Sequence, residues 1–469
     1  PYPRGNLRMA QSPAAAPTRG HPKGLYLLFT TEMWERMSYY GMRALLVLYM
    51  VGATDKGGFG WSQAKALQIF GIYTGLVYAT PVLGGLLADR YLGQRLSVTL
   101  GGILMMLGQF VLAMPGNSEV LFFSGLGLLV VGNGFFKPNI STMVGGLYEP
   151  GDPRRDGAFT IFYIGINAGA FLASVVCGTL GEKYGWMYGF GSAGVGMALG
   201  VVIFLALGKR LLGNVGTAPK PVERKAGMAA APAQALTRQE KDRVIVILVL
   251  ALFVVFFWAA FEQAGGLMNL YTDAKVDRGV FGWQVPTTWF QAVNPIFIML
   301  LGPIFAEMWT GLGRKNKDPS IPAKMAMGLL LVSFGFVFML GASKQSEMAG
   351  KAALMWVVAA YFFHTAGELC LSPVGLSMVT KLAPTRYASL LMGVWFIANA
   401  VANYLAGLIG GYAEKLGEFN LFMAITIATA VAGVVLLALA PMLKRMMHGA
   451  DETTPVQPAE EAEPKPQLA

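Results

Sequence analysis

The segment that decides the fold is TEMWERMSYYGMR at residues 31–43, which lies within an otherwise apolar run at 25–50. A run of this length can cross a bilayer as an α-helix. Counted from its first glutamate, the polar and aromatic residues recur at i, i+3, i+4, i+7, i+8 and i+11, the spacing of one helix face. They are Glu32, Glu35, Arg36, Tyr39, Tyr40 and Arg43.

Ionisable side chains are costly in the interior of a membrane. Where they occur, they face the interior of a helix bundle or a water-filled cavity, and they pair with one another or handle a solute. The four on this helix face therefore predict a pathway for a polar solute that is coupled to protons. A buried ladder of structural ion pairs is the alternative.

Composition places the rest of the chain in a membrane as well. Of the 469 residues, 55% are hydrophobic and 13% are charged, against roughly 25% charged in a soluble domain. The net charge of +10 does not indicate nucleic-acid binding, because the basic residues mark the ends of apolar segments, as topology signals do. No zinc-type spacing, Walker loop or GxSxG motif occurs, so we expect no metal and no cofactor, with protons as the coupling ion.

Apolar segments of about 20 residues recur along the chain and predict an all-α integral membrane protein with twelve transmembrane helices. The predicted spans are 25–50, 62–88, 96–115, 119–146, 157–181, 186–208, 243–270, 286–309, 322–342, 352–380, 387–413 and 418–446.

The spans fall into two sets of six. The predicted units are an N-terminal tail (1–23), a six-helix bundle (24–208), a linker (209–242), a second six-helix bundle (243–446) and a disordered acidic tail (447–469). The linker and the loops on its side of the membrane hold most of the Lys and Arg residues, so both termini are expected in the cytoplasm.

Two loops, one in each predicted half, have a similar sequence pattern. GLLADRYLGQR at 85–95 and GPIFAEMWTGLGRK at 302–315 each place an acid at a helix end, then a tight glycine turn, then basic residues. The first is similar to the G-x-x-x-D-R-x-x-G-x-R loop of the major facilitator superfamily. That resemblance implies a six-plus-six transporter that alternates access by rocking one half against the other.

Three further ionisable residues, Lys137, Glu262 and Glu368, lie deep in other spans. With the first helix they make four acids and three bases, so one proton would neutralise the set, although an unseen cation or a backbone dipole would also balance it. Arg36 and Lys137 belong to the first half and Glu368 to the second. A cavity between the halves would then have walls of opposite sign, which suits a zwitterion such as a short peptide or an amino acid.

Amide and aromatic side chains accompany these charges. Asn167 and Asn294 can each donate to and accept from a peptide bond. Several aromatic residues could line side-chain pockets, or could serve only for packing. They are Tyr39, Tyr40, Tyr78, Trp258 and Trp395.

Six motifs in this order resemble those of the bacterial proton-dependent oligopeptide transporter family, over most of residues 24–446. The motifs are ExxER at 32–36 with YYG at 39–41, GFFKP at 134–138, FYxxINxG at 162–169, Trp258 with Glu262, NP at 294–295, and GEL at 367–369 with SP at 372–373. The resemblance implies import of di- and tripeptides across the bacterial cytoplasmic membrane, driven by the inward proton gradient. We expect the functional unit to be a monomer.

The resemblance also implies residue roles in substrate binding. Arg36 and Lys137 would hold the substrate carboxylate, and Glu368 would receive the amino terminus. Asn167 and Asn294 would contact the peptide backbone. The remaining candidate substrate residues are Tyr39, Tyr40, Tyr78, Trp258, Ser372 and Trp395.

Proton coupling would involve Glu32 and Glu35 beside the two cations. Arg43 and Glu262 would form a salt bridge between the halves, closing the outer gate and opening when Glu262 is protonated. A proton on that carboxylate removes the attraction that holds the two bundles together.

His364 is a possible pH modulator. It precedes Glu368 by four residues on the same helix face, so it could relay protons or alter the proton affinity of that carboxylate. The animal relatives carry a histidine in the second helix, and alignment on Tyr78 puts Gly71 at that place. The alternative for His364 is a packed or lumen-facing residue without a role.

Other functions remain open at this stage. The same fold could carry nitrate, an amino acid or a drug, or could sense peptides without transporting them. Glu35 and Glu368 favour peptides, because a pure anion carrier has no need of a buried acid facing its solute. An enzyme is disfavoured, because no nucleophile–base pair or metal cluster is visible.

Overall fold

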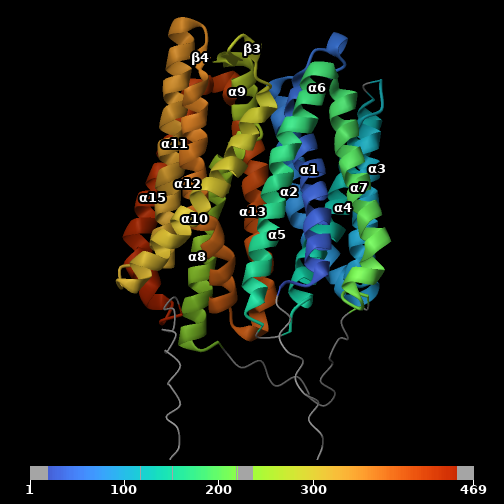
Figure 1. The fold of residues 1–469 in the computed structure, drawn as a ribbon. Helices are drawn as coiled ribbons and strands as arrows, with labels where there is room; N and C mark the ends of the chain where they lie inside the picture. Colours follow the sequence, from blue (N-terminus) through green and yellow to red (C-terminus); the bar gives the residue numbers. More distant parts are fainter. Residues whose placement is uncertain (1–19, 117, 150–151, 218, 220–235, 451–469) are drawn as a thin grey trace, which may run out of the picture.

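The computed structural model describes residues 20–116, 118–149, 152–217, 219 and 236–450. Long helices running side by side between an upper and a lower end form nearly all of this part of the chain (Figure 1). The helix α1 (Lys23–Val51) begins at the lower end, and α15 (Glu418–Met446) ends there. Most of both predicted tails and residues 220–235 of the predicted linker lie outside the described residues.

The other α-helices are α2 (Gln63–Leu87), α3 (Gln94–Leu112), α4 (Glu119–Gly146), α5 (Arg154–Leu172), α6 (Thr179–Tyr184), α7 (Trp186–Leu212), α8 (Arg238–Phe261), α9 (Leu267–Lys275), α10 (Val293–Arg314), α11 (Ile321–Ala349), α12 (Leu354–Leu382), α13 (Ala388–Gly410) and α14 (Ala413–Leu416). Short 3-10 or π turns are η1 (Thr54–Lys56), η2 (Ala88–Leu92), η3 (Ala173–Gly178), η4 (Glu262–Ala264), η5 (Thr287–Ala292) and η6 (Thr385–Tyr387).

Among the described residues, eleven helical segments are long and apolar enough to cross a membrane. At 29 residues α1 is also long enough, but it carries the charged face that the sequence predicts. The segment Arg154–Tyr184 is continuous through α5, η3 and α6, and Thr287–Arg314 is continuous through η5 and α10.

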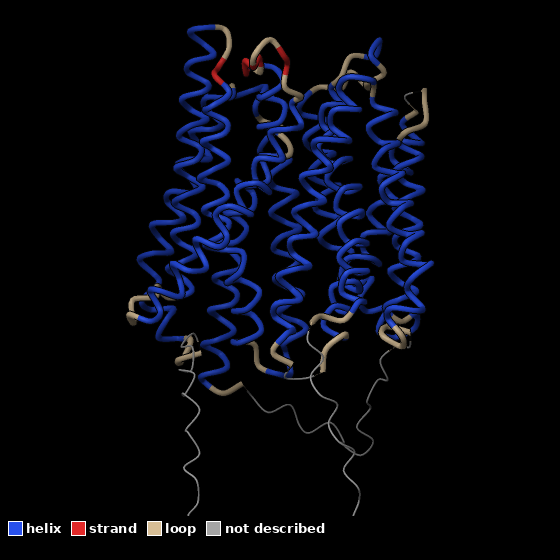
Figure 2. The backbone as a smooth tube through the Cα atoms, in the orientation of Figure 1, coloured by secondary structure: helices blue, strands red, loops and turns tan. Residues whose placement is uncertain are grey.

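The described residues are nearly all helical, as predicted, and four short strands at the upper end are the exception (Figure 2). Strand β1 (Val276–Asp277) pairs in parallel with β4 (Ala352–Ala353), and β2 (Gly279–Val280) pairs antiparallel with β3 (Trp283–Gln284). Each strand has two residues. That is too short for an alternating pattern to show in the sequence.

Side chains cap several helices where the apolar segments begin. Ser62 accepts from the N–H of Lys65 at the start of α2, and Thr237 with Glu240 forms a capping box at the start of α8. Such caps satisfy N–H groups that have no partner within the helix. They fix where the spans begin.

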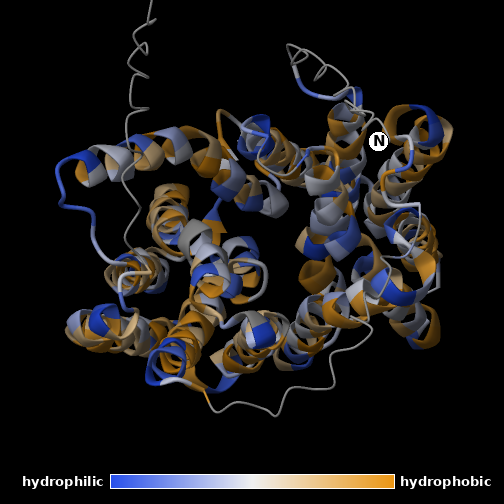
Figure 3. Ribbon diagram, turned by 90° about the horizontal axis from the view of Figure 1, so that it is seen from below, coloured by the Kyte–Doolittle hydropathy of each residue, from blue (hydrophilic) through white to orange (hydrophobic). Residues whose placement is uncertain are grey.

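The buried apolar residues form two clusters. One is built from residues 25–212 together with Leu270, and the other from residues 246–447. Apolar residues occur along all the helices (Figure 3), and many of them are exposed, such as Leu83 at 63% and Val120 at 75%. An apolar surface of this extent indicates contact with lipid.

The first cluster depends on a close crossing of α2 and α4. A Cβ atom added at Gly84 would collide with the backbone carbonyl oxygen of Gly134. Glycines at such a crossing let two membrane helices approach until their backbones touch. Gly127, on the exposed face of α4, has open space around its Cα.

We expect Gly84→Ala to lower the free energy of unfolding by about 1–3 kcal/mol, because the added methyl group overpacks this crossing. Gly127→Ala is the matched control, and it should leave stability unchanged or raise it by up to about 1 kcal/mol through helix propensity. Unfolding of the purified protein in mixed micelles measures both variants. Equal stability of the two variants would contradict this account of the crossing.

Candidate functional site

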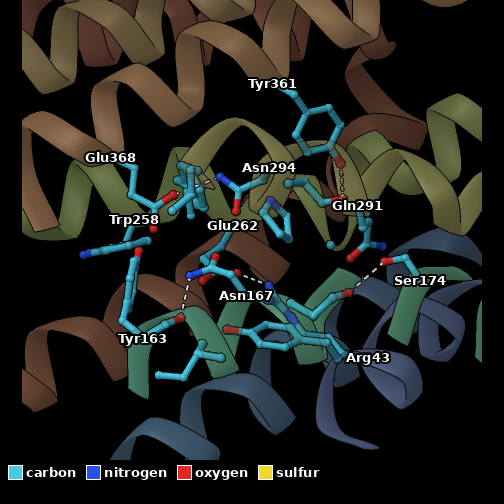
Figure 4. A pocket seen from close by; sticks show the side chains of 18 of the residues that line it. Arg43, Tyr163, Asn167, Ser174, Trp258, Glu262, Gln291, Asn294, Tyr361 and Glu368 are labelled. Atoms are coloured by element: carbon cyan, nitrogen blue, oxygen red, sulfur yellow. Dashed lines mark hydrogen bonds and ion pairs between the residues drawn. The ribbon is translucent and has the colours of Figure 1, made fainter. Parts of the chain in front are cut away.

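The helices α1–α7 and α8–α15, which hold the two apolar clusters, form two groups, the first and second halves of the molecule. A cavity lies between these groups, and polar and aromatic side chains from both line it (Figure 4). The first group contributes residues from α1, α2, α5 and η3, and the second contributes residues from α8, η4, η5, α10 and α12. The polar and aromatic lining residues are Tyr40, Arg43, Tyr78, Tyr163, Asn167, Ser174, Trp258, Phe261, Glu262, Gln291, Asn294, Tyr361 and Glu368.

An amide and a carboxylate form the polar wall of the second group. The side-chain nitrogen of Asn294 donates to Glu368 Oε2 at 2.9 Å and to Thr365 Oγ1 at 3.0 Å. This links α10 to α12 and holds the Glu368 carboxylate at the cavity surface (Figure 4). One carboxylate oxygen has a protein donor, and the wall is acidic when Glu368 is ionised.

An ion pair between Arg43 of α1 and Glu262 of η4 joins the two groups beside this cavity. The Arg43 and Glu262 side chains are 12% and 5% exposed. The Arg43 guanidinium also lies 5.6 Å from the ring centre of Phe70. Both charges are therefore shielded from solvent, and each depends on the other for compensation.

The charged face of α1 forms a compact cluster behind the cavity wall. Arg36 pairs with Glu32, at 3.0 Å, and with Glu35. Asn133 of α4 donates to Glu35 at 3.5 Å. Arg36 Nη2 and Glu32 Oε2 are buried and make no hydrogen bond with any described residue. The cluster therefore keeps hydrogen-bonding capacity after its ion pairs have formed.

A second cation lies close to this cluster. Lys137 Nζ is 4.3 Å from the ring centre of Tyr78, and it makes no ion pair with any residue in the described part of the chain. Arg36 lies 5.9 Å from the ring centre of Tyr40. Since Tyr40 and Tyr78 line the cavity, each cation lies one aromatic ring behind the wall.

The structure brings half of the predicted site residues to the cavity surface. Tyr40, Arg43, Tyr78, Asn167, Trp258, Glu262, Asn294 and Glu368 line the cavity. Glu32, Glu35, Arg36, Tyr39, Lys137, Ser372 and Trp395 are not among its lining residues. Trp395 is 4% exposed and packs against Gly375 within the second apolar cluster.

His364 lies away from the cavity, on the side of α12 that packs against α11. It is 1% exposed, its ring centre is 4.7 Å from that of Phe336, and it fills the space beside Gly335. A role for it in pH dependence stays a prediction. At Gly71 there is no room for a histidine, because an added Cβ would lie 2.8 Å from the Cα of Gly407.

Several lining or supporting residues were not predicted as site residues. Tyr163 accepts from the side chain of Asn167, at 2.9 Å, through its backbone oxygen, and it precedes that residue by one helical turn. Tyr361 stands two turns before Glu368, and Gln291 three residues before Asn294. Helical spacing from the predicted residues could have found these three. Asn133 also stands one turn before the predicted Lys137, but its contact with Glu35 depends on packing of α4 on α1, which spacing does not give.

Outside the spans, one strongly held carboxylate lies on the loop before α5. Hydrogen bonds from Arg154 lower the pKa of Asp152 to about 2, so this group stays ionised at physiological pH. A response to protons in that range must therefore come from other groups. The described residues contain no group of three His, Cys, Asp or Glu side chains placed to hold a metal ion.

The sequence matches a known family over most of its length. The family model described as PTR2, POT family, matches residues 95–235 and 226–425. The peptide transporter YePEPT of Yersinia enterocolitica is 37% identical, over 92% of this chain and 96% of that protein. A di-/tripeptide transporter of Lactococcus lactis subsp. cremoris is 33% identical, over 91% of this chain and 97% of that protein.

Solved structures agree with the sequence matches. A peptide transporter POT in complex with sulfate has a TM-score of 0.85 and 39% identity, over 92% of this chain and 97% of that one. A POT family transporter in complex with 5-aminolevulinic acid has a TM-score of 0.83 and 30% identity, over 91% of this chain and 98% of that one.

The Arg43–Glu262 pair gives a test of stability. We expect Arg43→Leu to lower the free energy of unfolding by about 3–5 kcal/mol, because it leaves the Glu262 carboxylate buried without a partner. The double variant Arg43→Leu, Glu262→Leu should recover most of that loss. Unfolding in mixed micelles measures both variants.

The Lys65–Glu119 pair supplies the matched control for this test, since its side chains are 47% and 58% exposed. Lys65→Leu should change stability by less than about 1 kcal/mol. A double variant at Arg43 and Glu262 that is as unstable as the single variant would contradict mutual compensation of the buried pair.

Proposed function

The chain belongs to the POT family of transporters, as its motifs predict, and we propose that it imports di- and tripeptides together with protons. The single observation that carries this proposal is the polarity of the cavity. The Glu368 and Asn294 wall belongs to one group of helices, and the cations Arg36 and Lys137 stand behind the opposite wall.

A short peptide fits between such walls in one orientation. Its amino terminus would lie at Glu368, and its carboxylate would approach Arg36 and Lys137. Asn167 and Asn294 would contact its backbone. The ligands of the related structures support this reading, because sulfate is an anion and 5-aminolevulinic acid carries both an amino and a carboxyl group.

Proton coupling is proposed to act through the same charges. Arg36 is shared between Glu32 and Glu35, so a proton on either glutamate would release the guanidinium toward a substrate carboxylate. A proton on Glu262 would remove its attraction for Arg43 and let the two groups of helices separate. No cofactor is required in this scheme, and the functional unit is a monomer.

The proposed topology has twelve membrane crossings in two six-helix bundles. They are the eleven apolar segments together with α1. The protein would lie in the bacterial cytoplasmic membrane with the lower end inside. Basic residues at helix ends support this orientation through the positive-inside rule. They include Arg155 in the first turn of α5, Arg314 at the end of α10 and Lys444 in the last turn of α15.

In this orientation the structure resembles an inward-open state. The Arg43–Glu262 pair ties the groups together beside the upper part of the cavity. A second cavity of about 960 Å³ lies between the groups below, lined by Ser141, Phe159 and Arg155 of one group and Met392 and Phe396 of the other. Solute could leave toward the cytoplasm by this route.

The test is uptake of labelled dialanine into proteoliposomes, with and without an inward proton gradient. We expect accumulation that depends on the gradient and falls about tenfold or more in Lys137→Ala, the size of a lost hydrogen bond to a charged group. Lys344→Ala is the matched control, since this lysine side chain is 63% exposed and its ion pair, with Glu347, lies within α11.

The other outcomes separate the remaining functions. Binding or exchange of dialanine without accumulation would indicate a sensor or a facilitator. A protein that responds to nitrate or to drugs and not to dialanine would overturn the peptide assignment.

A further inference from the structure

Glu182 joins the two groups of helices at the upper end of the molecule. It lies in α6, and its carboxylate accepts hydrogen bonds from the backbone N–H groups of Thr287 and Thr288, each at 2.8 Å. The Thr288 hydroxyl donates a third bond at 2.7 Å, and the Arg278 guanidinium lies 3.6 Å away. Both threonines belong to η5, which continues into α10.

The arrangement is a helix cap supplied from the opposite half. The first N–H groups of the η5–α10 segment have no partner within their own helix, and the helix dipole favours a negative charge beside them. The Glu182 side chain is 15% exposed, so water competes little for it. Next to it, Trp289 Nε1 donates to Thr179 Oγ1 at 2.9 Å. The halves cannot separate here without breaking these bonds.

A second acid makes the equivalent contact in the opposite direction. Glu414 lies in α14 of the second half and accepts from the backbone N–H of Gln63, the first residue of α2, at 2.7 Å. Thus α6 caps the segment that leads into α10, and α14 caps α2. Each acid comes from one half and each capped helix from the other.

The sequence repeats at these two places. Residues 182–185 are EKYG and residues 414–417 are EKLG. Gly185 has φ 118° and ψ 154°, and Gly417 has φ 80° and ψ 150°. Only glycine adopts such angles readily, so the same turn follows each acid and leads into α7 or α15. The acids therefore occupy matching positions in the two halves.

We propose that Glu182 and Glu414 form a pair of latches, related by the internal repeat, that hold the outer end of the transporter closed. Glu182 is the stronger latch, because it is mostly buried and accepts three hydrogen bonds. Glu414 is exposed and accepts one. These are positioning residues, which set the balance between inward-open and outward-open states without touching the substrate. The proposal rests on alternating access in the proposed function.

The helical segment that Glu182 caps also carries residues of the proposed substrate site. The η5–α10 segment that Glu182 holds carries Gln291 and Asn294, both of which line the central cavity. Release of the latch would free the end of the element that places these two amides. Closure of the outer end and the shape of the site are thereby coupled through one continuous helical segment.

The test measures the distance across the outer surface between two spin labels in the full chain, in lipid nanodiscs without substrate. Lys56→Cys in η1 and Met348→Cys in α11 are exposed positions on opposite halves, and the native Cys177 and Cys370 are buried. The distances are recorded in the native chain and in the Glu262→Gln variant. In that variant the ion pair with Arg43 is lost, so closure of the outer end depends more on the latches.

We expect Glu182→Gln to raise the ratio of the long-distance to the short-distance population about tenfold, because the amide nitrogen cannot accept from the capped N–H groups. Thr288→Val removes only the hydroxyl bond from the other side, and should raise the ratio about threefold. Glu414→Gln should raise it by less than about threefold. Glu119→Gln is the control, because this outer acid pairs with Lys65 within its own half and should change nothing.

The proposal is overturned if Glu182→Gln leaves the distances of the native and Glu262→Gln chains unchanged, or if Glu119→Gln shifts them equally. Thr288→Val keeps the test valid if Glu182→Gln fails to fold. Dialanine uptake by each variant separates the two proposals. Uptake by the native chain with unchanged distances in Glu182→Gln removes the latches alone, whereas shifted distances in Glu182→Gln without any uptake by the native chain support the latches and remove the peptide assignment.

Discussion

A charge buried among apolar helices is stable only beside a partner, and α1 carries four such charges. Arg36 finds two glutamates on its own helix, whereas Arg43 pairs with Glu262 from the other half of the molecule. The first arrangement keeps the ion pairs of the cluster within one helix, and Asn133 of α4 supports them. The second makes the contact between the halves part of the electrostatic stability of the protein. Separation of the two halves would therefore leave the Arg43 and Glu262 charges without their partners.

The contacts between the halves differ at the two ends of the molecule. At the upper end, polar contacts cross between the halves in both directions, through Glu182 and through Glu414. Near the lower end a cavity of about 960 Å³ separates the halves instead. Hydrogen bonds and ion pairs at a seam can be exchanged for water or for a solute, while an apolar seam has no such replacement. Polar contacts at the outer end of the seam suit a protein whose halves must separate and rejoin.

Much of the site could be predicted from helical spacing together with the polarity of single residues in apolar segments. The face of α1 emerged from a 3.6-residue period, and Glu368, Asn294 and Asn167 are polar residues in segments that are otherwise apolar. Spacing could not tell which face of α12 meets the cavity. His364 and Tyr361 stand one and two turns before Glu368, yet Tyr361 lines the cavity and His364 packs against α11. The direction of a side chain depends on which neighbour the helix packs against, and one helix does not contain that information.

The sequence by itself determined that this is a membrane transporter of the POT family, because apolar length, buried charge and motif order are properties of the chain. It also determined the chemistry of the site, since the carboxylates, amides and cations are fixed by residue type. Only the tertiary structure decided which of them meet. Arg43 and Glu262 are 219 residues apart, and Glu182 and Thr287 are 105 residues apart. Such contacts form because helices cross at glycine-lined faces, and a linear pattern does not specify the partner at a crossing.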